Sequence, residues 1–446
     1  MEARTKLDKV GYAMIFVLIA FATLLYGAVH QGVLALVYIS IVLMVVLWAA
    51  DGLRFGSIRF GREPIQLILF AAALYGLFQV MPAGTVSATG GVDGIPWTIS
   101  LDPFATQVNA LHFLALGLFL AFVCQSIDSA NRLRKLAIFI TTFGAFYAFY
   151  AILQSLLSPT MIFGLLERPM PFGSFVSRNN FAGLMEMAVA IPLGMVLSGS
   201  ISKDKRLIYL TAAVLMGISI VLSGSRGGLI ALVVQIGFLG FITYSLRDRS
   251  SKLLKVGLAA GILAAIILGT AFVGGENALS RIREDQTTAE GVVTRPQIWK
   301  VTVKMIGANL PFGVGLGAYG VAYTKYDEAS GFERVEQAHN DYLQVVSDGG
   351  IVGGALGLAF LFLVFKLGWK ASRVSNLERR GIASGAFAGI FGVLLHSLFD
   401  FVLHTTAIAL LFLTLVGMLV AAGSRFPDDT SEPERRRRRT KTATAA

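Results

Sequence analysis

The chain has 446 residues, of which 55% are hydrophobic and only 15% charged. Soluble globular chains carry about 25% charged residues, so this composition excludes a soluble fold and favours a protein surrounded by lipid. The single cysteine, Cys124, excludes an intramolecular disulfide and a cysteine-based metal cluster. The net charge is +11.

Apolar runs long enough to cross a bilayer recur along the chain, since a hydrocarbon core of about 30 Å needs roughly 20 helical residues. We therefore predict an all-α, polytopic membrane bundle of about twelve transmembrane helices. Because another span follows the first almost at once, no cleavable signal peptide is expected. The approximate spans are 10–29, 31–50, 64–82, 109–124, 136–157, 180–198, 207–223, 227–245, 256–273, 349–369, 383–401 and 404–423.

Lysine and arginine are distributed unevenly over the segments between these spans. With the N-terminus placed in the cytoplasm, 28 of the 38 Lys and Arg fall in inside segments, and the outside loop 83–108 has none. This bias is the positive-inside pattern, so we expect both termini to be cytoplasmic. It also explains the net positive charge without a nucleic-acid partner.

The spans divide the chain into a transmembrane domain, residues 1–424, and a basic tail, residues 425–446. The tail is predicted to be disordered and cytoplasmic. Anionic lipid can attract its arginine run, Arg435 to Arg439, although a topology anchor and a solvated tail explain this run better. A large outside loop, about 274–348, separates the ninth and tenth spans. A loop this long can hold small helices and is usually functional.

Ten basic residues lie outside and run against the general bias, so some of them are candidates for function. The clearest is Arg226, in the segment from Leu222 to Leu229, at the outward-facing start of a span. Backbone N–H groups and the positive dipole end lie there, and an arginine fork pairs bidentately with phosphate oxygens. A tight helical hairpin with a snorkelling arginine explains the same residues equally well.

A similar arrangement begins an earlier span, where Arg178 precedes Asn179 and Asn180. Arg178 can contact phosphate. The asparagines can hold a sugar, although capping of the helix explains them better. Within the same span, Glu186 is expected to be neutralised by a partner inside the bundle.

The large outside loop contains Arg295, a glycine-rich turn from Pro311 to Gly317, and His339 followed by Asn340, Asp341 and Tyr342. A histidine titrates near neutral pH and can take a proton from a hydroxyl nucleophile, although a lone histidine is more often structural. Asp341 can orient His339 or hydrogen-bond a sugar. Further on, His396 and Asp400 are spaced to pair with each other, which indicates a packing role.

These motifs, in this order, resemble the O-antigen ligase superfamily, which also contains Wzy-type polysaccharide polymerases. The pieces that carry the resemblance are Arg178 to Gly183, Ser223 to Gly228, Arg295 with Trp299, Pro311 to Gly317, His339 to Gln344, and His396 with Asp400-Phe401.

The resemblance implies a bacterial inner-membrane enzyme of cell-surface polysaccharide biosynthesis, with a periplasmic active site. It implies metal-independent, inverting transfer of a glycan from undecaprenyl diphosphate to a hydroxyl on a glycan or lipid A–core acceptor, with no cofactor. Arg226 and Arg295 match the family's essential arginines, and His339 its essential histidine. Substrate contacts are expected from Arg178, Asn179, Asn180, Asn340, Asp341 and Tyr342. Membrane lipid and polysaccharide assembly proteins are the other expected partners.

The choice between ligase and polymerase stays open at this level, with a lean toward an exopolysaccharide-type polymerase by analogy. A second class is a transporter or flippase for a lipid-linked glycan, although the charged groups cluster at one face and match no inverted repeat. A third is a scaffold for the assembly machinery, in which Arg226 and His339 would be dispensable.

Overall fold

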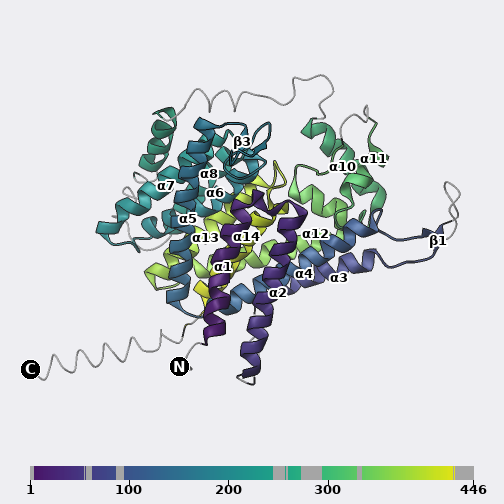
Figure 1. The fold of residues 1–446 in the computed structure, drawn as a ribbon, viewed down its shortest axis with the longest axis horizontal. Coiled ribbons are helices and arrows are strands. Elements are labelled where there is room, and N and C mark those ends of the chain that lie inside the picture. The colour runs from purple at the N-terminus through teal and green to yellow at the C-terminus, as the bar shows by residue number, and fades with distance from the viewer. Residues whose placement is uncertain are drawn as a thin grey trace, which may run out of the picture.

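The computed structural model describes residues 5–54, 56, 63–86, 95–244, 257, 260–272, 294–328, 334–424 and 426. Nearly all of the secondary structure in these residues is helical (Figure 1). The α-helices are α1 Lys6–Leu24, α2 Gln31–Arg54, α3 Ile65–Gln79, α4 Pro103–Ser126, α5 Ala130–Leu157, α6 Arg178–Leu197, α7 Lys203–Ser223, α8 Arg226–Tyr244, α10 Arg295–Asn309, α11 Tyr319–Tyr326, α12 Asp341–Ala371, α13 Leu377–His396 and α14 Thr406–Gly423.

Short elements complete the fold. The two 3-10 turns are η1 Tyr26–Ala28 and η2 Val402–His404, and a further apolar helix covers Ala260–Phe272. Two antiparallel strand pairs, each strand two residues long, are β1 Thr85–Val86 with β2 Ile95–Pro96, and β3 Met161–Ile162 with β4 Leu166–Glu167.

In the described part of the chain, nine helices are long and apolar enough to cross a membrane: α1, α2, α4, α5, α6, α7, α8, α12 and α14. The protein is therefore a polytopic helical membrane protein. The other three predicted spans coincide with α3, with Ala260–Phe272 and with α13. At 15 residues, α3 is about 22 Å long and shorter than a bilayer core, so the number twelve stays a prediction.

The core of the bundle is formed by α6 and α14, whose residues are almost all buried. Glycines let α13 pack closely on α6. A Cβ on Gly194 would lie 2.3 Å from the backbone nitrogen of Gly385, and a Cβ on Gly385 would lie 2.5 Å from the carbonyl oxygen of Ala190. Such backbone contact between small residues is the usual basis of helix association in membranes. It fixes the ends of α6 and α13 relative to each other.

Segments that the charge bias places inside meet at one end of this bundle. Arg132, at the start of α5, pairs with Asp8 of α1, and Arg134 pairs with Glu378 of α13. Arg379 donates to the carbonyl of Ala422 at the end of α14, at 2.7 Å. The segments expected on the inner side therefore lie at the same end of the bundle. That this end faces the cytoplasm remains a prediction.

The predicted outside loop contributes α10 and α11, which lie together beside α12 (Figure 1). They have a small core of their own, which includes Ile298, Met305, Tyr319 and Tyr323. Gln79 of α3 ties this lobe to the bundle, because its side chain bonds the carbonyl of Phe312 and the amide of Leu316. Residues 274–293 and, except for 426, the predicted tail lie outside the described residues.

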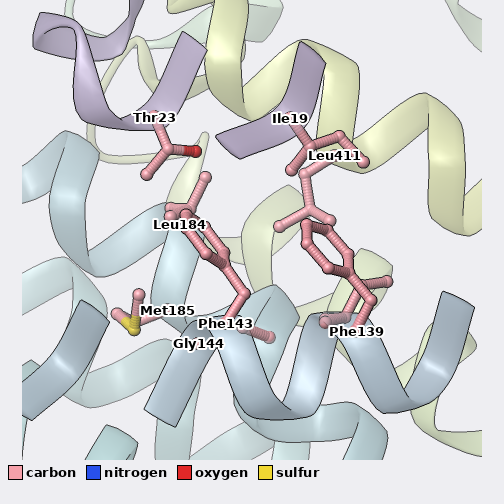
Figure 2. Close-up of a pocket in the computed structure, with 10 residues that line it drawn as sticks. Ile19, Thr23, Phe139, Phe143, Gly144, Leu184, Met185 and Leu411 are labelled. Atoms are coloured by element: carbon pink, nitrogen blue, oxygen red, sulfur yellow. The ribbon is translucent and has the colours of Figure 1, made fainter. Parts of the chain in front are cut away.

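A small cavity lies among α1, α5, α6 and α14 (Figure 2). Its walls are apolar apart from Thr23, and they include Phe139, Phe143 and Leu184. The lining contains none of the predicted site residues, so the chemistry must be sought elsewhere.

Candidate active site

Asp400, in the turn after α13, is the centre of a polar cluster drawn from four parts of the chain. Its Oδ1 lies 3.1 Å from Nδ1 of His339, and its Oδ2 lies 3.0 Å from Nη2 of Arg295. Asn179 donates its side-chain amide to Oδ2, and the backbone N–H of Phe401 donates to Oδ1 at 2.9 Å. The Asp400 side chain is only 4% exposed, so these partners replace water around the carboxylate.

These partners keep Asp400 ionised. Burial opposes the charged form, but the hydrogen bond with His339 and the charge of Arg295 outweigh it and lower the pKa of Asp400 to about 2. An ionised carboxylate only accepts hydrogen bonds, so Nδ1 of His339 carries the hydrogen. In the neutral ring the lone pair is then on Nε2, the atom that can take a proton from a ligand.

The backbone at His339 is held in an unusual conformation. Its φ of 49° lies in the left-handed region, which non-glycine residues adopt rarely and at a cost of about 1–3 kcal/mol. The indole of Trp299 bonds the carbonyl of Ala338 at 3.0 Å, and the His339 ring packs edge-on against Phe401 at 4.9 Å. The imidazole is 35% exposed. A strained, oriented and accessible histidine is typical of a functional site rather than a packing role.

The turn that carries Arg226 explains the small residues around it. Gly224 ends α7 in the left-handed conformation, with φ of 70°, and Ser225 caps α8 by accepting the amide of Gly228 at 3.2 Å. A Cβ on Gly227 would lie 2.6 Å from the ring of His396, so the first turn of α8 is pressed against the end of α13. Arg226 itself is exposed, at the end of the bundle that holds Asp400.

The start of α6 differs in detail from the prediction. The helix is capped by Ser177, whose hydroxyl accepts the amide of Asn179 at 3.3 Å, so the asparagines do not serve as the cap. Instead Asn179 contacts Asp400, while Asn180 is buried. Arg178 is the first residue of the helix and is half-buried.

At the start of α12, Asp341 contacts His404 and the amide of Leu403 rather than His339. The orienting role suggested for Asp341 therefore belongs to Asp400. Asn340 caps α12 and donates to the carbonyl of Leu398 at 2.9 Å.

Tyr342 is likewise used within the protein, since its hydroxyl donates to the carbonyl of Leu394 at 2.7 Å. Asn340 and Tyr342 thus fasten the His339 loop to the end of α13.

The predicted pairing of His396 with Asp400 is wrong. His396 instead lies 2.9 Å from Oε1 of Glu186, and both side chains are completely buried. The expectation that Glu186 has a partner inside the bundle is confirmed.

The N-termini of α6, α8, α10 and α12 thus converge near the C-terminal end of α13. Asn179, Gly227, Arg295 and His339 mark these four helix starts, and each contacts Asp400 or His396. Helix N-termini offer free N–H groups and positive dipole ends, which attract anions. With Arg178, Arg226 and Arg295 at three of them, the cluster combines a positive field with an oriented imidazole.

The fold and this cluster define a polytopic membrane protein with an arginine- and histidine-containing site at one end of its helices. Residues 211–358 match a family model described as O-Antigen ligase. The match covers Arg226, Arg295 and His339, and it agrees with the resemblance that the sequence motifs carry. No curated protein matches the chain. The match supports a function of the O-antigen ligase or polymerase type, with a lipid-linked glycan and a polysaccharide acceptor as the general substrates.

Proposed function

We propose that this protein moves a glycan from undecaprenyl diphosphate to a hydroxyl acceptor at the periplasmic face of the inner membrane. It acts as polymerase or ligase in cell-surface polysaccharide biosynthesis. The observation that carries the proposal is the buried Asp400, which holds His339 and Arg295 on its two oxygens, within a family-matched region that also contains Arg226.

His339 serves as general base. Its Nε2 takes the proton of the acceptor hydroxyl while the ionised Asp400 stabilises the imidazolium that forms, as a buried aspartate does in a catalytic triad. The acceptor oxygen bonds to the anomeric carbon as the bond from that carbon to the diphosphate oxygen breaks. The electron pair leaves with undecaprenyl diphosphate. Attack opposite the leaving group inverts the anomeric configuration.

Arg226 and Arg295 stabilise the negative charge that grows on the departing diphosphate. Arg295 is 44% exposed although it is paired with Asp400, so its guanidinium is both oriented and accessible. Arg178 adds a third cation at the start of α6. In this scheme arginines and helix N-termini supply the positive charge, so the reaction is metal-independent.

Three of the other predicted substrate residues position the catalytic groups. Asn179 holds Asp400, and Asn340 and Tyr342 hold the loop of His339. Asn180 is buried within the first turn of α6.

The test is glycan transfer by membranes that contain the full chain, with undecaprenyl-diphosphate-linked repeat unit as donor. His339→Ala and Arg226→Ala should each lower transfer at least a hundredfold, whereas His30→Ala, an exposed histidine on the turn before α2, should not. Full activity of both site variants would overturn the proposal.

Complementation of a deletion strain separates the two forms of the reaction. If the protein is a ligase, the deletion strain makes lipopolysaccharide that ends at the bare core, and lipid-linked polymer accumulates. If it is a polymerase, the deletion strain keeps intact lipopolysaccharide, and single repeat units remain on the lipid carrier.

A further inference from the structure

A second histidine–carboxylate pair lies beside the first and is built from the same two segments. Nδ1 of His404 lies 2.6 Å from Oδ1 of Asp341, and Oδ2 of Asp341 accepts the amide of Leu403 at 3.2 Å. The pairs are crossed. Segment 339–341 provides a histidine and then an aspartate, whereas segment 400–404 provides an aspartate and then a histidine.

The second pair has the properties that make the first a functional candidate. The Asp341 side chain is 7% exposed and both of its oxygens are engaged, so it is a fixed anchor. The His404 side chain is 34% exposed, nearly the same as His339. A carboxylate that accepts from Nδ1 leaves Nε2 as the ring atom that can bind a ligand. The proposed transfer reaction makes no use of this imidazole.

The two clusters differ in charge and in the helices that form them. Arg178, Arg226 and Arg295 belong to the starts of α6, α8 and α10, which suit a diphosphate. His404 belongs to η2 and is paired with the carboxylate of Asp341. An imidazole next to a carboxylate suits uncharged hydroxyls better than a phosphate, because the carboxylate repels an anion.

We propose that His404, anchored by Asp341, forms a binding subsite for the hydroxyl groups of the acceptor glycan. This inference rests on the proposed transferase function, and it names where the second substrate lies. Residues 339 and 341 are at most about 7 Å apart along the backbone. One oligosaccharide can therefore offer its reacting hydroxyl to His339 while a neighbouring sugar contacts His404.

The test measures binding without turnover. The probe is the oligosaccharide repeat unit released from the strain's own surface polysaccharide, added to the purified full chain carrying His339→Ala. Adding His404→Gln should weaken binding at least tenfold. His30→Gln is the matched control and should change nothing. Equal binding by all of these proteins would overturn the subsite.

A second measurement uses undecaprenyl diphosphate as the probe, which Arg226→Ala should weaken and His404→Gln should not. If His404→Gln weakens the lipid diphosphate instead of the oligosaccharide, the subsite belongs to the donor and the inference is wrong. Asp341→Asn is a milder variant that still accepts the amide of Leu403, so the protein should stay folded, and it should weaken oligosaccharide binding.

In the active protein, His404→Gln should raise the KM for acceptor at least tenfold and leave the KM for donor unchanged. A fall in kcat alone would contradict the subsite. An error in the proposed transferase mechanism would give a different result, because His339→Ala would then transfer glycan as fast as wild type.

Discussion

The Asp400→Asn substitution tests the central contact of the site with the smallest change in shape. It keeps the volume of the side chain and removes the charge that faces Nδ1 of His339 at 3.1 Å. At an effective dielectric of about 20, a unit charge pair at this distance is worth about 5 kcal/mol, which is an upper limit of about 10⁴ in rate. Because His339 is 35% exposed, solvent screens part of this energy, and we expect kcat to fall about 10²- to 10³-fold.

The assay is transfer at saturating donor and acceptor in membranes with matched protein levels. The double variant Asp400→Asn with His339→Ala should lose much less than the product of the two single penalties, because Asp400 supports proton transfer only through His339, and its other role is to hold Arg295. A kcat for Asp400→Asn above one third of the wild-type value would refute the assignment of His339 as an Asp400-supported base. Multiplying penalties in the double variant would refute it as well.

Other variants probe the surroundings of the site. The pKa of Asp400 is lowered to about 2, so its ionised carboxylate stabilises the folded protein at pH values above its ordinary pKa of about 4. This stabilisation is lost as the pH falls from about 4 to about 2. Acid-unfolding curves should therefore show that Asp400→Asn is less sensitive to pH in that window, with a difference of about 2–3 kcal/mol in the free energy of unfolding. Gly227→Ala would place a methyl group 2.6 Å from the His396 ring, so thermal unfolding should show a loss of about 1–3 kcal/mol in stability. Transfer activity should also fall, although Arg226 is intact. Unchanged stability and activity would mean that α8 is not held against α13. Glu186→Ala leaves His396 buried without its partner and should destabilise the protein by about 3–5 kcal/mol, which denaturant titration of the purified protein measures; a change below 1 kcal/mol would contradict the buried pair. Arg226→Lys keeps the charge but loses the planar fork, and steady-state kinetics should show activity between those of wild type and Arg226→Ala; full activity would show that charge alone suffices.

Sequence reasoning found most of the helical architecture because its signal is local. Hydrophobic runs of membrane length and the bias of Lys and Arg are readable without neighbours, and each predicted span coincides with a helix in the described residues. The same holds for Arg226, Arg295 and His339, which stand in recognisable motifs. The structure adds that Arg295 and His339 share one carboxylate.

The side-chain partners of these residues depend on how distant helix ends pack in the folded bundle. Asp341 is two positions from His339 and was the natural candidate to orient it, but Asn340 caps the helix between them and Asp341 contacts His404 instead. Asp400, 61 positions further along, takes the place next to His339.

Glu186 and His396 are another such pair, separated by 210 positions and joined where α6 and α13 pack through glycine. Hydropathy and flanking charge are local properties of each segment, so the helices and their expected orientation could be predicted from the sequence. Side-chain partners depend on which helix ends meet, and close packing between distant segments sets that only in the folded bundle.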